Sequence, residues 1–407
     1  MTNRAPNRVL VPLGVGLALS LIGDQTLYTV LPNPEIAAQA GVTLGMVGVL
    51  LGINRLTRVV FNIPAGMLYS KRPRRGLMIA AMCFAVLSTM FYAFARGVEL
   101  LLIGRVLWGI AWSGIWIGSN TVALDISHKY NRGQITGRLQ AWFFLGIGLA
   151  SFAGGVFTDL FGYRGGLWVS TALTAGGVLL WVLTLPETRP PEMDEKPEAH
   201  TDNPKPPFPW KTALQVSVPT FVLRLVFAGV LTATTILWLA QFVDGGILLP
   251  GLVLPLATLT GGFVAVRVLV SMLSAPLSGS ISDRLGRRWA VMVVVFAVGA
   301  GGLWLMSLQI AAVAVIGALI ATVSAGSIQS LVPAIIGDQA GVGEPSRVIG
   351  VVYTIGDLGS AIGPMFGLML VPLIGLGSVY QICAVLFGLV GLFAAFLAFR
   401  EPVIPVI

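Results

Sequence analysis

Seven ionisable side chains lie inside long apolar stretches of this sequence, and they are its main candidates for chemistry. A charged group in hydrocarbon costs several kcal/mol unless it faces water or an opposite charge. Such groups are retained where they bind an ion, move a proton or hold helices together. The seven are Asp24, Arg55, Arg58, Arg105, Arg224, Arg267 and Asp357.

Asp24 and Arg105 fall at similar depths in two of these stretches. Asp24 lies about 12 Å, and Arg105 about 9 Å, from the same predicted membrane surface, at 1.5 Å of rise per helical residue. A buried carboxylate changes its affinity for a proton when it gains or loses a cationic neighbour. We expect Asp24 to carry a proton with Arg105 as its switchable partner; a static ion pair is the alternative.

Further charges lie near the predicted middle of the membrane, namely Arg58, Arg267 and Asp357. Arg55 lies one helical turn from Arg58 and faces the same side. Charges at this depth mark a site or path for a solute, and three arginines against one acid favour a substrate with an anionic group. The alternative is that Asp357 neutralises Arg58 or Arg267 structurally. Arg224 lies nearer a predicted membrane surface, where its side chain can extend to water.

Three tryptophans share a helix face with Arg105, since Trp108, Trp112 and Trp116 follow it at spacings of three and four residues. If Arg105 faces a cavity, Trp112 and Trp116 line it too and offer amphipathic surfaces to an apolar substrate. The alternative is helix packing or anchoring at the membrane interface.

The composition places these residues in a polytopic membrane protein. Of 407 residues, 56% are hydrophobic and only 10% are charged, and the mean hydropathy is +0.88. Soluble domains are about 25% charged, so an ordinary soluble enzyme is excluded. With two cysteines and two histidines, a disulfide scaffold and a His/Cys metal site are excluded as well.

Hydropathy predicts an all-α protein with twelve membrane-spanning helices, each of about 20 residues. Positive charge sets their orientation, because 18 of the 25 lysines and arginines lie in segments on the side of the N-terminus and two on the other side. Both termini are therefore expected in the cytoplasm. We expect the chain to lie in the plasma membrane, or inner membrane, of the cell. This distribution also explains the net charge of +8 without nucleic acid. The predicted spans are 9–32, 43–66, 76–95, 99–121, 138–158, 165–185, 214–241, 253–277, 289–308, 310–333, 348–372 and 378–399.

The chain repeats itself with an offset of 213 residues, which indicates two pseudo-symmetric six-helix bundles. We expect an N-terminal bundle over 1–185, a cytoplasmic linker over 186–213 and a C-terminal bundle over 214–407. The linker is rich in proline and charge and has no apolar periodicity. The matched pairs are Gly66 with Gly279, Arg74 and Arg75 with Arg287 and Arg288, Asp125 with Asp338, Gly137 with Gly350, Gly146 with Gly359 and Gly154 with Gly367.

A charged motif between predicted spans eight and nine resembles the G-x-x-x-D-R-x-G-R-R motif of the major facilitator superfamily. Its residues are Gly279, Asp283, Arg284, Gly286, Arg287 and Arg288. A degenerate copy between spans two and three keeps Gly66, Lys71, Arg74 and Arg75. Ser70 replaces the aspartate there, and Pro73 replaces the glycine, so we expect a weaker latch in that half. Glycine lets a helix end turn tightly against its neighbour, and Asp283 can lie at the N-terminus of another helix, where the dipole favours negative charge. Such charged clusters would gate the movement of the halves; the alternative is charge that only sets topology.

A second motif is similar to the G-x-x-x-G-P-x-x-G-G pattern of antiporters in the superfamily. In span five it reads Gly146-Ile-Gly148-Leu-Ala150-Ser151-Phe-Ala-Gly154-Gly155, and in span eleven the repeat keeps Gly363-Pro364. Small residues permit close helix approach. With Asp24 facing an Arg105-x-x-x-Gly109 motif, the chain most resembles the drug/proton antiporter branch.

The resemblance implies a secondary active transporter that works by alternating access, with proton-coupled export of a small amphiphilic or anionic molecule. Uptake of an anion or organic solute by symport, and flipping of a lipid or glycolipid, are the alternatives. No lysine follows a glycine, so the phosphate loop of an ATP-driven pump is absent, and we expect no enzyme activity. We expect a monomer with a small-molecule substrate in a lipid bilayer, no metal, and no cofactor other than a proton gradient.

Overall fold

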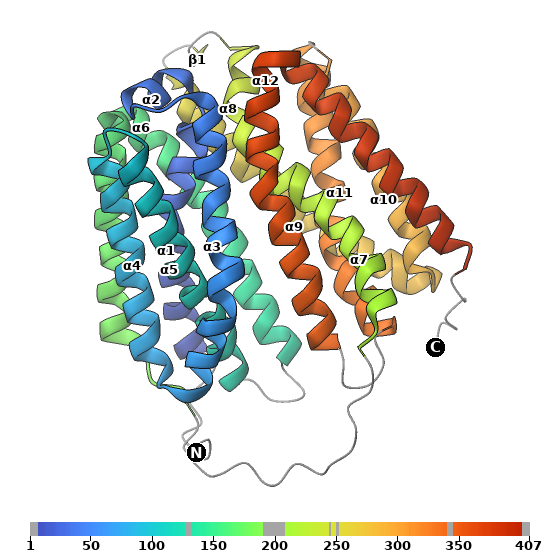
Figure 1. Ribbon diagram of the computed structural model, residues 1–407, viewed down its shortest axis with the longest axis horizontal. Helices are drawn as coiled ribbons and strands as arrows, with labels where there is room; N and C mark the ends of the chain where they lie inside the picture. Colours follow the sequence, from blue (N-terminus) through green and yellow to red (C-terminus); the bar gives the residue numbers. More distant parts are fainter. Residues whose placement is uncertain are drawn as a thin grey trace.

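The protein is a bundle of long helices in a computed structural model that describes residues 7–126, 132–189, 208–243, 246–249, 252–308, 310–339 and 345–400 (Figure 1). Within these ranges, ten helices are long and apolar enough to cross a bilayer. The fold class predicted from composition, an all-α membrane protein, is confirmed apart from one short hairpin.

The helices fall into two sets, called here the N-terminal half (α1–α6) and the C-terminal half (α7–α12). The N-terminal half contains α1 (Asn7–Val30), α2 (Pro34–Gln39), α3 (Leu44–Lys71), α4 (Arg74–Phe94), α5 (Val98–Asp125) and α6 (Arg132–Thr184). The C-terminal half contains α7 (Trp210–Leu223), the π-helix η2 (Arg224–Leu231), α8 (Thr232–Ala240), β1 (Gly246–Leu249), β2 (Leu252–Pro255), α9 (Leu256–Leu285), α10 (Arg288–Met306), α11 (Ala311–Gln339) and α12 (Pro345–Ala398).

Two helices, α6 with 53 residues and α12 with 54, are long enough for two crossings each. Each contains one glycine with a non-helical backbone, Gly162 with φ 72° and Gly375 with φ 79°. Only glycine adopts this left-handed region without strain. In Figure 1, α12 reverses direction at the top of the bundle. The two glycines are separated by the predicted offset of 213 residues. Among the described residues, the structure has ten helices of membrane-spanning length where twelve separate spans were predicted, because α6 and α12 are each one continuous element.

Two local features were not predicted. The seventh predicted span is continuous from α7 to α8, but its middle is the π-helix η2. A π-helix has an extra residue in its turn and shifts the faces of the helix that follows. Between α8 and α9, β1 and β2 form an antiparallel pair, and β2 includes the first residues of the predicted span 253–277. The predicted boundary near Leu308 is confirmed, since α10 ends at Met306 and α11 begins at Ala311. Most of the predicted linker, 190–207, lies outside the described residues.

Among the described residues, the halves share a hydrophobic core at one end, called here the distal end. It is the end with α2 and the hairpin, opposite the proximal end where α1 begins (Figure 1). Two of the three clusters of buried apolar residues each belong to a single half. The third joins Leu27, Leu51 and Tyr92 of the N-terminal half to Ala257 and Leu368 of the C-terminal half. Its members lie toward the distal end of the bundle, some in helices and others, such as Ala40 and Ala95, in the connections between helices.

Small residues bring the backbones of the two halves into contact near this core. A Cβ atom on Gly52 of α3 would lie 2.3 Å from the Ala361 carbonyl oxygen of α12, and one on Gly155 of α6 would lie 2.2 Å from the Ala257 carbonyl oxygen of α9. At the proximal end, by contrast, a Cβ on Gly66 or Gly279 would meet no heavy atom within 4 Å. The structure is therefore a state in which the halves are closed distally.

Gly52→Val should lower the melting temperature of the purified protein by several degrees. The added side chain overlaps the α12 backbone, and overpacking of this kind costs about 1–3 kcal/mol. Gly45→Val is the matched control on the same helix, because a Cβ there has no heavy atom within 4 Å. Equal melting temperatures for the two variants would contradict the close contact of α3 with α12.

Candidate functional site

Asp24 of α1 and Arg105 of α5 form an ion pair inside the N-terminal half. Arg105 is completely buried, and Asp24 is 3% exposed. The remaining donors of the guanidinium are also used: Nε donates to the Leu50 carbonyl oxygen at 2.9 Å and Nη2 to that of Leu51 at 3.3 Å. The pairing expected from equal depth is observed, and it joins α1, α3 and α5.

Two tyrosines complete the surroundings of this pair. Arg105 lies over the Tyr28 ring, with 4.8 Å from Cζ to the ring centroid, and its Nη1 donates to the Tyr92 hydroxyl at 3.4 Å. The Tyr28 hydroxyl donates to the Leu51 carbonyl oxygen at 2.6 Å. A buried pair is tolerated only when its remaining donors and acceptors are satisfied, and these contacts supply that satisfaction.

A second set of charges joins the two halves near the middle of their helices. Arg58 Nη2 of α3 donates to Asp357 Oδ1 of α12 at 2.8 Å. Arg224, the first residue of η2, has its Nη1 atom 3.5 Å from the same oxygen. Arg224 was expected near a membrane surface. This was wrong, because Arg224 is the fifteenth of the 31 residues of the continuous 210–240 helix and therefore lies at its middle. Arg55, one turn from Arg58, faces the Tyr28 ring, 6.0 Å from Cζ to the centroid.

Arg267 of α9 forms no ion pair with Asp357. Asp357 was predicted to neutralise Arg58 or Arg267, and the ion pair that the structure shows is with Arg58. Arg267 is 8% exposed. Its Nε donates to Thr322 Oγ1 and its Nη1 to Thr235 Oγ1, both at 3.3 Å. Among the described residues no carboxylate pairs with it, and two threonine hydroxyls from α8 and α11 take that place.

The tryptophans of α5 form a ladder in the core of the N-terminal half. The ring centroids of Trp108 and Trp112 are 5.8 Å apart, and those of Trp112 and Trp116 are 5.7 Å apart with nearly parallel planes. Phe143 of α6 packs against Trp112 and Trp116. Trp112 is buried, whereas Trp116 is partly exposed. Contact of these rings with a substrate stays a prediction.

The complete copy of the charged motif forms a cluster within the C-terminal half. Arg288, at the start of α10, donates to Asp283, to Asp338 Oδ2 at 3.0 Å and to Ser282 Oγ at 2.6 Å. Gly286 ends α9 with φ 61°, a conformation that favours glycine. Asp283 was expected at the N-terminus of another helix, and its observed partner is the Arg288 side chain.

The degenerate copy forms a matching cluster in the N-terminal half. Arg74 Nε donates to Asp125 Oδ2 at 3.3 Å. Glu187, just after α6, caps α4 by accepting from the backbone N–H groups of Arg74 and Arg75 at 2.9 and 3.0 Å. Thr188 donates its hydroxyl to Asp125 at 3.0 Å. The residues that begin the predicted linker are thus fixed to this end of the N-terminal half.

Two carboxyl groups of this cluster have shifted pKa values. Partial burial raises the pKa of Asp125 above its ordinary value, although Thr188 and Arg74 oppose the shift. Burial alone would raise the pKa of Glu187, but backbone N–H donors from Arg189, Arg74, Arg75 and Thr188 outweigh burial and lower it. Ionised Glu187 is therefore the form that caps α4.

The other predicted gating residues are exposed or serve as contact points. Lys71, Arg284 and Arg287 are exposed at the proximal end. A Cβ on Gly66 or Gly279 would meet no heavy atom within 4 Å, and the gating role of both glycines stays a prediction. Gly363 does allow close approach, because a Cβ there would lie 2.4 Å from the Leu225 carbonyl oxygen of η2. Pro364 follows it within α12, and its carbonyl oxygen would lie 2.8 Å from a Cβ on Gly48.

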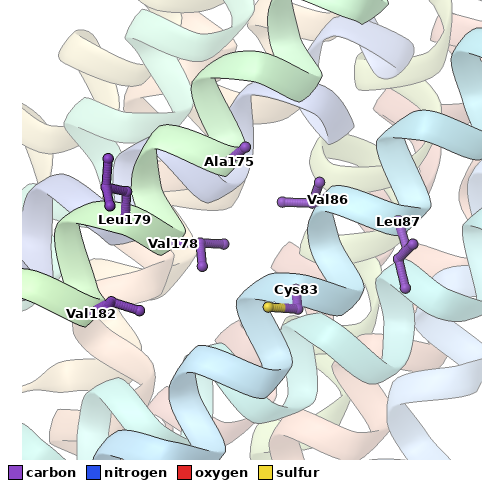
Figure 2. A pocket seen from close by; sticks show the side chains of 7 residues that line it. All are labelled: Cys83, Val86, Leu87, Ala175, Val178, Leu179 and Val182. Atoms are coloured by element: carbon purple, nitrogen blue, oxygen red, sulfur yellow. The ribbon is translucent and has the colours of Figure 1, made fainter.

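A groove on the surface of the N-terminal half contains none of these residues. It lies between α4 and α6 and has a volume of about 490 Å³ (Figure 2). Its lining is entirely apolar apart from one thiol. The lining residues are Cys83, Val86, Leu87, Ala175, Val178, Leu179 and Val182. The two charged sets, and not this groove, form the candidate site.

Sequence reasoning missed several partners in the site. Arg224 was assigned to the wrong depth, and Tyr28 and Tyr92 carried no charge to single them out. Glu187 lay at the start of the predicted linker and was not singled out. Asp125 and Asp338 marked the repeat, but their arginine partners are not repeat equivalents, because Arg74 precedes Asp125 by 51 residues and Arg288 precedes Asp338 by 50.

The family of the chain follows from comparison with known proteins. The sequence matches the profile of the Major Facilitator Superfamily over residues 13–266 and again over residues 246–406. The chain belongs to this superfamily, which is a family of multi-pass membrane transporters and not of enzymes.

Similarity to individual curated relatives is partial. The inner membrane transport protein YajR of Escherichia coli (strain K12) is 25% identical over 178 residues, which are 43% of this chain and 38% of that protein. The uncharacterized MFS-type transporter MT1926 of Mycobacterium tuberculosis (strain CDC 1551 / Oshkosh) is 24% identical over 280 residues, 67% of this chain and 37% of that protein. The matches thus span less than half of the length of these relatives.

Solved structures share the fold over nearly the whole chain. A bacterial homolog of the human lysosomal transporter Spinster, in an inward-facing and occupied conformation, has a TM-score of 0.76 at 16% identity and covers 96% of each chain. The human organic anion transporter MFSD10 (TETRAN) has a TM-score of 0.67 at 16% identity and covers 96% of this chain and 100% of that one.

The burial of Asp24 and Arg105 predicts strong coupling in a double-mutant cycle of thermal stability. Asp24→Asn or Arg105→Gln alone leaves an uncompensated buried charge, which costs about 3–5 kcal/mol. The double variant replaces the ions with a neutral pair and should melt closer to the unaltered protein than either single variant. Glu99→Gln, an exposed acid on α5, should melt as the unaltered protein does. Additive losses in the double variant would show that the two side chains do not stabilise each other.

Proposed function

We propose that this transporter exports a small amphiphilic or anionic molecule in exchange for protons, with Asp24 as the proton carrier and Arg105 as its partner. The observation that supports this most is the Asp24–Arg105 pair, buried in the N-terminal half and shared by α1, α3 and α5. Arg105, the cationic partner described for Asp24, lies on another helix. Movement of these helices therefore changes the distance between the two charges and with it the proton affinity of the carboxylate.

A route for such coupling runs through two adjacent glycines of α6. A Cβ on Gly154 would lie 2.4 Å from Thr26 Oγ1, two residues after Asp24 on α1. A Cβ on Gly155 would lie 2.2 Å from the Ala257 carbonyl oxygen of the other half. Because neighbouring residues of one helix touch both partners, movement of the C-terminal half against α6 is transmitted to the helix that carries Asp24.

Everted membrane vesicles with an acidified lumen test this function. Naphthalenesulfonate and tetraphenylphosphonium are suitable probes, because neither carries an exchangeable proton near neutral pH. For an exporter, a transported probe should collapse the pH gradient reported by acridine orange. Asp24→Asn should abolish the collapse, since an amide cannot carry the proton.

The matched control for this assay is Glu99→Gln, which neutralises an exposed acid on α5 and should leave the probe-driven collapse unchanged. Vesicles of each variant must contain equal amounts of protein. Collapse by Asp24→Asn at the rate of the unaltered protein would remove Asp24 from the proton path.

Uptake of an organic anion together with protons is the second candidate. It is favoured by the excess of arginines around Asp357, and one protein of the same fold is an organic anion transporter. The sign of proton movement separates the two: in liposomes with an internal pH dye, naphthalenesulfonate added outside makes the lumen more acidic during symport and more alkaline during exchange.

A further inference from the structure

The charges that meet around Asp357 do not balance. Arg58 and Arg224 both contact one oxygen of this carboxylate, at 2.8 and 3.5 Å. Arg55 lies one turn from Arg58 on α3. Among the residues that the structure describes, Asp357 is the only carboxylate that pairs with Arg58 and Arg224, whereas Arg55 forms no ion pair there and faces the Tyr28 ring. Three guanidinium groups against one carboxylate leave an excess of two positive charges at the centre of a membrane protein.

Two donors of this arginine cluster are buried without an acceptor, namely the Nε atoms of Arg55 and Arg58. Leaving a buried donor of a charged group unpaired costs more than an ordinary missing hydrogen bond. Arg58 is itself 7% exposed, so bulk water does not compensate it. Excess positive charge and unpaired donors are both features of a site that binds an anion.

Among the described residues, the exposed parts of the cluster lie on the side away from the distal end. Toward the distal end, the shared hydrophobic core and the contact of Gly52 with Ala361 close it. On the other side the Arg224 side chain is 31% exposed and Tyr353, one turn before Asp357 on α12, is 43% exposed. The Tyr353 ring centroid lies 5.7 Å from Arg224 Cζ. An incoming molecule therefore meets a cation and an aromatic ring together.

We propose that Arg55, Arg58, Arg224 and Tyr353 bind an aromatic organic anion through its carboxylate or sulfonate group, and that Asp357 is the internal carboxylate that holds the arginines when no such anion is bound. The Tyr353 ring offers a face to the aromatic part of the molecule. This inference rests on the proposed function, because it assigns a substrate class to the transporter.

Displacement of Asp357 also connects binding to movement. Arg224 and Asp357 both belong to the C-terminal half, whereas Arg58 belongs to the N-terminal half. An anion that takes over Arg58 therefore removes the direct ion pair between the halves and replaces it with contacts to the substrate. A ligand shifts a conformational equilibrium only through such differential contacts.

Equilibrium binding of radiolabelled salicylate to the purified protein in nanodiscs tests the site. Unlabelled salicylate and naphthalenesulfonate should displace the label, and neutral salicylamide should compete at least about tenfold more weakly. Arg224→Gln should weaken salicylate binding about tenfold, the effect of losing one charge-assisted hydrogen bond. Asp357→Asn should strengthen it severalfold, because the internal competitor is gone. Arg96→Gln, at an exposed arginine near the distal end, should bind as the unaltered protein does.

The opposite signs at Arg224 and Asp357 distinguish a binding site from a structural ion pair, in which both variants would weaken binding. Weaker binding by Asp357→Asn, or equal competition by salicylate and salicylamide, would overturn the proposal. Should either variant fold poorly, the unaltered chain decides: salicylate should raise its melting temperature and salicylamide should not. No gradient is present in these assays, so their result is independent of whether Asp24 carries protons.

Discussion

The high energy of a charge in hydrocarbon governs how the helices of this transporter are arranged. Both acids in the middle of the apolar stretches lie against arginines on other helices: Asp24 against Arg105 within one half, and Asp357 against Arg58 across the two halves. Each pair persists only if the helices that carry it stay close and satisfy the remaining donors. Small residues permit this, as Gly52 does for α3 against α12 and Gly154 does for α6 against α1.

The two ends of the bundle differ in what holds them. At the distal end the halves share apolar side chains and touching backbones. At the proximal end each half has its own cluster of arginine and aspartate, around Arg74 and Arg288. A state closed at one end, with separate polar clusters at the other, is what rocking of two bundles about a central site requires. In Figure 1, α3 and α12 lie side by side at the boundary between the two halves.

Much of the fold was predictable from the sequence, because lipid requires long apolar helices and the repeat is encoded in residue spacing. Similar depth, together with the resemblance of the Arg105-x-x-x-Gly109 motif, was enough to pair Asp24 with Arg105. The partner of Asp357 was less predictable, because hydropathy fixes the depth of a residue but not the rotation of its helix. The π-helix that starts at Arg224 changes that rotation, and it gives no signal in hydropathy. Arg267 shows the same limit, since neutral threonines of two other helices satisfy it. Capping by Glu187 depends on a backbone geometry that residue types alone do not specify.

The central claim is that the ion pair between Arg58 and Asp357 helps to hold the halves in the distally closed state. Spin labels at two exposed sites near the proximal end, Leu68 of α3 and Leu277 of α9, would report the separation of the halves by pulsed electron resonance. Cys83, an exposed free thiol, must first be replaced by serine. We predict that Asp357→Asn adds a population with a shorter distance between the labels, because loss of the ion pair lets the distal end open and the proximal ends approach. Identical distance distributions with and without Asp357 would contradict the account.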